Sequence, residues 1–63
     1  MNKDLRNTAL YIVNGIICDY KDHKGIYPSI EIVRACFNFP KYADITDREI
    51  EHIITMVKRY DNR

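Results

Sequence analysis

Apolar side chains recur at intervals of three and four residues in three separate stretches of the chain. This spacing places them on one face of a helix. The first stretch comprises Leu5, Ala9, Ile12, Val13, Ile16, Ile17 and Tyr20. Gly and Pro interrupt the pattern over residues 25–28 and again over 38–45, and no alternating run is long enough for a sheet. The pattern predicts an all-α protein, a compact three-helix domain with a helix-turn-helix-like arrangement.

The first helix is predicted over about residues 3–24, with Asn2 or Asn7 as its N-cap. Gly25 stands where a helix commonly ends in the left-handed conformation, and basic residues precede it near the negative end of the helix dipole. Gly15 costs about 1 kcal/mol relative to Ala inside a helix, so we expect a close helix approach or a bend there.

The second helix is predicted over about residues 29–38, capped by Ser29. Pro40 ends it, because proline lacks an amide proton and pushes the preceding residue out of the helical region. The expected buried side comprises Ile30, Val33, Cys36 and Phe37. The loop that follows is apolar, so we expect Phe39, Tyr42 and Ile45 either to fold over the core or to lie on a partner-binding surface.

The third helix, predicted over about residues 46–60, has the most specific local signal in the chain. Thr46 and Glu49 have the spacing of a capping box, and Ile45 and Ile50 that of a hydrophobic staple. The expected apolar side comprises Ile50, Ile53, Ile54, Val57 and Tyr60, with Met56 at its edge.

Length and composition favour one small cytoplasmic domain spanning residues 1–63. A chain of 63 residues buries only roughly 60% of its unfolded surface, so we expect pairing into a homodimer to help it. Two cysteines are too few for a disulfide framework, and "MNKDLRNT" has no apolar signal region. The run "ALYIVNGIIC" is about half the roughly 20 residues of a membrane span, so no membrane partner is expected.

The outward side of the third helix carries a stripe of residues that can contact nucleic acid. Arg48, His52, Thr55 and Arg59 fall together there, and these types bind bases and phosphates. We therefore expect a small transcriptional regulator that binds double-stranded DNA with this helix, while Lys24, Arg34 and Lys41 approach phosphates. The competing interpretation is a solvated polar face, because the net charge is only +1 and acidic Asp47 and Glu51 adjoin the stripe.

The stretch "GIYPSIEIV" after a long first helix is similar to the start of the second helix in the DNA-binding domain of LexA-type repressors. Members of that family have Pro and Ser or Thr at the offsets of Pro28 and Ser29 from Gly25. The resemblance covers about residues 16–37 and implies a helix-turn-helix with the third helix in the major groove. The turn over residues 38–45 is longer than that family's, and no base-contacting residue aligns clearly.

Other chemistry is weakly indicated. Cys18, His23, Cys36 and His52 lack the paired spacing of a zinc site, and we expect the cysteines in the core and the histidines on the surface. No nucleophile has an orienting group, so neither an enzyme nor a cofactor is expected.

The main alternative to DNA binding is a phage-type inhibitor or adaptor that docks on a host protein through helix faces and Tyr27, Phe39 and Tyr42, since aromatic residues are enriched at interfaces. A structural role in a larger particle is also open.

Overall fold

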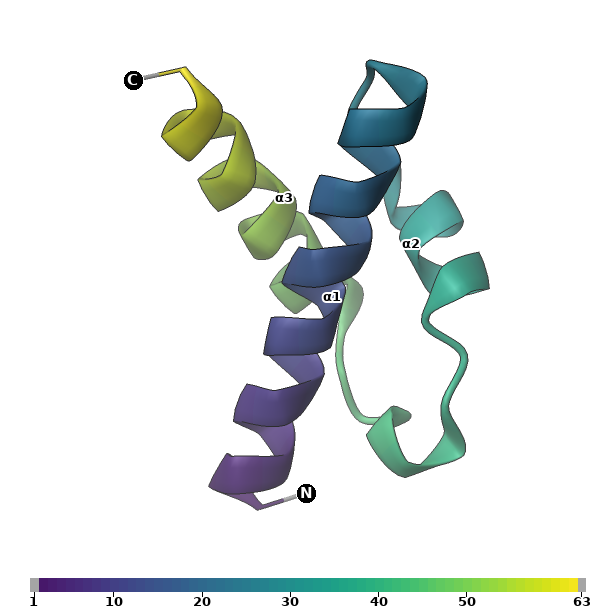
Figure 1. The fold of residues 1–63 in the computed structure, drawn as a ribbon. Coiled ribbons are helices and arrows are strands. Elements are labelled where there is room, and N and C mark those ends of the chain that lie inside the picture. Colours follow the sequence, from purple (N-terminus) through teal and green to yellow (C-terminus); the bar gives the residue numbers. More distant parts are fainter. Residues whose placement is uncertain (1, 63) are drawn as a thin grey trace.

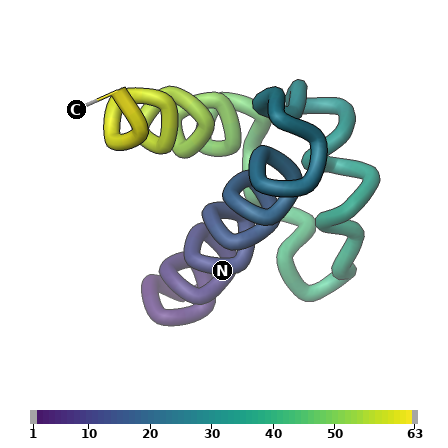
Figure 2. Tube along the Cα trace, turned by 45° about the horizontal axis from the view of Figure 1, so that its top comes forward, coloured from purple at the N-terminus to yellow at the C-terminus, as the bar shows by residue number. Residues whose placement is uncertain are grey.

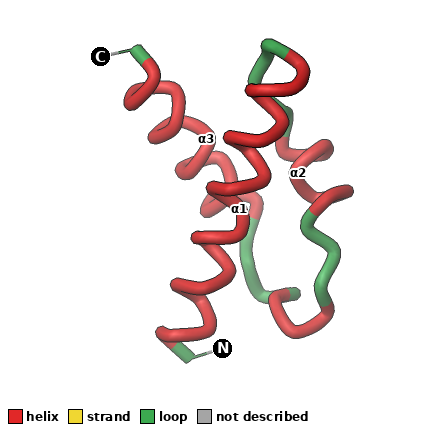
Figure 3. Tube along the Cα trace, in the orientation of Figure 1, coloured by secondary structure: helices red, strands yellow, loops and turns green. Residues whose placement is uncertain are grey.

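A computed structural model describes residues 2–62 of the chain and contains three α-helices and one short 3-10 helix (Figure 1). No strand occurs within this part of the chain (Figure 3). The all-α, three-helix prediction is confirmed. The elements in chain order are α1 (Lys3–Lys24), α2 (Ile30–Cys36), η1 (Pro40–Tyr42) and α3 (Asp47–Asp61).

Both ends of α1 are closed as its sequence predicts. The Asn2 side chain accepts a hydrogen bond from the Leu5 amide at 2.8 Å, so Asn2 rather than Asn7 is the N-cap. Gly25 has φ 76°, and its amide donates to the Lys21 carbonyl at 2.9 Å. A Cβ atom placed on Gly15 would meet nothing within 4 Å. The predicted close helix approach at Gly15 is therefore wrong.

Helix α2 is shorter than predicted, because it ends at Cys36 rather than near residue 38. Ser29 caps its start by accepting a hydrogen bond from the Ile32 amide at 3.3 Å. Phe39 adopts an extended conformation (φ −117°, ψ 118°) before Pro40, as expected for a residue that precedes proline. The chain then turns through η1, which the sequence pattern did not predict.

Three aromatic rings pack together along this connection. Phe37 and Tyr42 stack with their centroids 5.6 Å apart, and the Phe39 ring meets both edge-on. Phe37 and Tyr42 are each only 4% exposed, whereas Phe39 is 45% exposed. The loop thus folds back over the core, and Phe39 alone keeps a large exposed surface.

The core forms where the three helices and the connection meet. Its buried residues are Ala9, Val13, Ile17, Val33, Phe37, Tyr42, Ile45, Ile50, Ile54 and Val57. The helical members lie on the faces that periodicity predicts to be buried, and Tyr42 and Ile45 follow the first of the two alternatives for their loop, which is packing over the core.

Three sequence-based core assignments are wrong. Cys18 and Cys36 are exposed, and Tyr60 is 73% exposed. Cys18 and Cys36 lie at the margins of their helix faces, outside the cluster of buried residues. Figures 1 and 2 show the C-terminal part of α3, the helix that carries Tyr60, diverging from α1.

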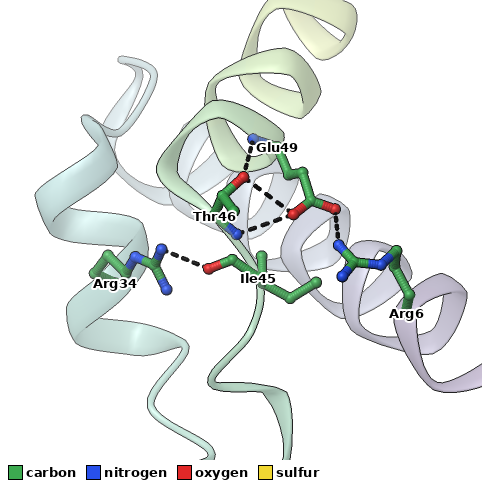
Figure 4. A network of polar contacts seen from close by, with 5 residues as sticks. All are labelled: Arg6, Arg34, Ile45, Thr46 and Glu49. Atoms are coloured by element: carbon green, nitrogen blue, oxygen red, sulfur yellow. Dashed lines mark hydrogen bonds and ion pairs between the residues drawn. The ribbon is translucent and has the colours of Figure 1, made fainter. Parts of the chain in front are cut away.

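A polar network fixes the start of α3 against both other helices (Figure 4). The Thr46 hydroxyl accepts from the Glu49 amide at 3.2 Å, and the Glu49 carboxylate accepts from the Thr46 amide at 3.0 Å, which confirms the capping box. Arg6 of α1 donates to the same carboxylate. Arg34 of α2 donates to the Ile45 carbonyl at 2.6 Å. The direction of α3 is therefore set at its N-terminus.

Candidate nucleic-acid interface

The predicted stripe lies along the outer side of α3. All four of its residues are exposed, and they lie on the side of α3 opposite the buried Ile50, Ile54 and Val57. With 15 residues, α3 is about 22 Å long, and the stripe follows most of that length. The members are Arg48, His52, Thr55 and Arg59.

The arginines of the chain differ in how they are engaged. Arg6 forms an ion pair with Glu49, and the Arg34 Nε lies 2.9 Å from the Asp47 carboxylate. Within residues 2–62, Arg48 and Arg59 have neither an ion-pair partner nor a side-chain hydrogen bond. Each therefore keeps its five N–H donors for a carboxylate or phosphate outside the chain.

The acidic residues near the stripe are partly neutralised. Asp47 pairs with Arg34, and Glu49 accepts from Arg6. The Arg6 hydrogen bond, followed by the one from the Thr46 amide, lowers the pKa of Glu49 from 4.5 to about 2. Of the flanking carboxylates, Glu51 alone has no partner within the described residues. Two of the three carboxylates beside the stripe are therefore each balanced by an arginine of another helix.

The residues predicted to approach phosphates do not form one surface with the stripe. Lys24 is at the C-terminal end of α1 and Lys41 is in η1, and Figure 1 shows this end of α1 and η1 at opposite ends of the molecule. The Lys41 Nζ is 5.0 Å from the centroid of the Tyr42 ring. Arg34 is already bonded to Asp47 and to the Ile45 carbonyl, so these intramolecular bonds compete with any phosphate.

The three aromatic residues of the alternative hypothesis differ in their exposure and in their contacts. Tyr42 is in the core, and Phe39 is half exposed beside it. The Tyr27 hydroxyl donates to the Asp61 carboxylate at 2.6 Å, which, together with partial burial, raises the pKa of Tyr27 to about 12. The Nζ atoms of Lys21 and Lys58 lie 5.2 and 5.5 Å from the centroid of its ring. Tyr27 therefore joins the ends of α1 and α3.

Sequence reasoning missed an apolar groove between α1 and α3, with a volume of about 470 Å³. Its α1 wall is formed by Asn14 and Cys18, and its α3 wall includes Ile53, Met56 and Tyr60. Partial burial, followed by the charges of Asp61, Asp22 and Asp19, raises the pKa of the Cys18 thiol. The exposed Met56 at the edge of the α3 pattern was a signal that could have pointed to this groove.

Metal and membrane sites are not evident in residues 2–62. No group of three or more His, Cys, Asp or Glu side chains there could hold a metal ion. None of the helices in this part of the chain has the length and apolar character needed to cross a membrane.

Comparisons with protein-family models, curated proteins and solved structures found no match to this chain.

Proposed function

We propose that the protein binds double-stranded DNA through the exposed stripe of α3 and acts as a small transcriptional regulator. The observation that carries the proposal is the pairing of the arginines. Arg6 and Arg34 form ion pairs within the fold. Arg48 and Arg59, by contrast, lie exposed on one side of α3 and have no partner among residues 2–62. Arginine in this setting suits bidentate bonding to guanine or to phosphate.

The placement of α3 supports entry into a groove of DNA. Its N-terminus is held by the capping box and by Arg6, while its other end diverges from α1 (Figures 1 and 4). The major groove, about 12 Å wide, admits an α-helix, and the N-terminal part of a recognition helix commonly contacts the bases. Arg48 and His52 occupy that part of α3.

The resemblance to LexA-type repressors supports the same assignment for α3, with two departures: no base-contacting residue aligns clearly, and the turn before α3 differs. The connection over residues 37–46, which includes η1, is longer than the three- or four-residue turn of a helix-turn-helix. The proposal therefore rests on α3 and its exposed side chains.

The test is fluorescence anisotropy of labelled mixed-sequence duplex DNA over a series of salt concentrations. We expect binding that weakens with salt, and a slope of log K against log[salt] that is reduced by about 1 in Arg48→Glu. Lys3→Glu is the matched control, because it makes the same charge change at an exposed residue of the first turn of α1. Equal losses in both variants, or no binding at low salt, would contradict the proposal.

A second candidate is an inhibitor or adaptor that binds a host protein. The half-exposed Phe39 ring favours it, because Phe37 and Tyr42 hold this ring against the core and so limit the entropy lost on docking. In that case Phe39→Ala would weaken binding to the isolated partner, and Arg48→Glu would not.

A further inference from the structure

A small hollow adjoins the N-terminal half of the α3 stripe. It has a volume of about 260 Å³ and lies between α1 and α3. Leu10 of α1 and Ile53 of α3 form its apolar part, and Arg48, Glu49 and His52 complete the lining. It is distinct from the larger groove described above, with which it shares only Ile53. Two of the four stripe residues, Arg48 and His52, therefore border an apolar depression.

The charged groups of this lining differ in their availability. The Glu49 carboxylate accepts from Arg6 and from the Thr46 amide, so its oxygens are engaged within the fold (Figure 4). Arg48, by contrast, has neither an ion-pair partner nor a side-chain hydrogen bond within residues 2–62. A ligand that matches this surface would present hydrogen-bond acceptors to Arg48 and apolar atoms to the hollow.

The major groove of DNA offers these two features side by side. Guanine presents its N7 and O6 acceptors, which an arginine binds in a bidentate manner. The apolar group in the major groove is the methyl group at C5 of thymine. The base 5-methylcytosine carries the same group at the same ring position. A phosphate, by contrast, offers acceptors only and would leave the hollow unfilled.

We propose that the hollow receives the C5-methyl group of a pyrimidine next to the base that Arg48 contacts. The inference rests on the proposed function, because it requires α3 to lie in the major groove. Leu10 and Ile53 remove the methyl group from water, and burial of such a group strengthens binding about threefold to fivefold. The protein therefore prefers sites with this methyl group, whereas phosphate contacts carry no sequence information.

The test begins with selection of bound duplexes from a random-sequence pool, followed by sequencing. We expect enrichment of a thymine next to a guanine. In the enriched duplex, each thymine is then replaced singly by deoxyuridine, which lacks only the methyl group, and affinity is measured by fluorescence anisotropy. One replacement should weaken binding about threefold to fivefold, and the others should leave it unchanged.

A second replacement separates the two sources of the methyl group. At the sensitive position, the thymine–adenine pair is exchanged for a cytosine–guanine pair with or without the 5-methyl group. Tighter binding of 5-methylcytosine than of cytosine, by the same factor, would show that the methyl group is read in either base. Equal binding of the two would restrict the site to thymine.

Matched variants locate the contact. Leu10→Asn places a polar group in the hollow without changing the net charge. It should abolish the difference between thymine and deoxyuridine, while the salt dependence of binding stays the same. Leu5→Asn is the control, because Leu5 is also partly buried in α1 and lies outside the lining, and this variant should keep the difference.

The inference and the proposed function can fail separately. Salt-dependent binding without enrichment of any base, or without a sensitive thymine, would overturn the inference and leave DNA binding intact. The same discrimination in Leu10→Asn as in the wild type would also overturn it. The deoxyuridine measurement uses the wild-type protein, so it stays decisive if a variant fails to fold. No binding of duplex DNA at low salt would overturn both.

Discussion

The two glycines of the chain permit a sharp test of the fold, because the same substitution should have opposite effects at each. A Cβ atom would meet nothing within 4 Å at either Gly15 or Gly25. Steric crowding is thus removed from the comparison. The remaining difference is the backbone: Gly15 lies inside α1, whereas Gly25 has φ 76° in the left-handed region.

The magnitudes follow from these conformations. Gly15→Ala should stabilise the protein by about 0.5–1 kcal/mol, because alanine loses less backbone entropy in a helix interior. Gly25→Ala should destabilise it by about 1 kcal/mol, since left-handed backbone costs an L-residue about 1–2 kcal/mol and the stiffer unfolded chain offsets part of that. For a domain of this size, each kcal/mol shifts Tm by about 4–8 °C.

The assay is urea and thermal unfolding followed by circular dichroism at 222 nm. A protein concentration of a few micromolar keeps self-association from contributing to the measured stability. We expect Tm to rise for Gly15→Ala and to fall for Gly25→Ala. Shifts of the same sign, or destabilisation by Gly15→Ala, would refute the assignment of these two backbone conformations.

Two further outcomes concern the network at the start of α3. The pKa of Glu49 is lowered from 4.5 to about 2, so its contribution to the free energy of unfolding is fully present above pH 4.5 and is lost as the pH falls toward 2. In acid titrations of unfolding, Glu49→Gln should therefore lose less stability over this window than the wild type does. Glu51→Gln, at an exposed residue of the same helix, should behave as wild type. Thr46→Ala removes the hydroxyl that accepts from the Glu49 amide and should lower the free energy of unfolding in urea by about 1 kcal/mol. The control is Thr55→Ala, at an exposed position inside the same helix. A decrease for Thr46→Ala no greater than that for Thr55→Ala would contradict the role of the cap.

Local chemistry accounts for the part of the fold that the sequence predicts well. Gly25, Ser29, Pro40 and Thr46 act on the backbone within a few residues, so the ends they impose can be recognised without knowing the tertiary structure. The short η1 was not predicted, because the turn after Pro40 depends on Tyr42 packing against Phe37 in the core.

Longer-range features were not accessible in this way. Periodicity identifies the apolar face of a helix but does not tell how closely the neighbouring helix packs along it, and Tyr60 lies on the wall of an open groove rather than in the core. Arg6 and Glu49 are 43 residues apart, so their pairing follows only from the packing of α1 against α3. For the same reason, the sequence did not reveal the ion pairs that Arg6 and Arg34 form with acidic residues beside the α3 stripe. It also did not reveal the groove between α1 and α3.

The most direct test of DNA binding by α3 is a titration of ¹⁵N-labelled protein with duplex DNA, followed by amide chemical shifts in two-dimensional NMR spectra. If α3 enters a groove of DNA, the largest salt-sensitive shifts should cluster at the backbone amides of Arg48, His52, Thr55 and Arg59. Shifts confined to the groove residues Cys18 and Met56, or no shifts at low salt, would contradict it.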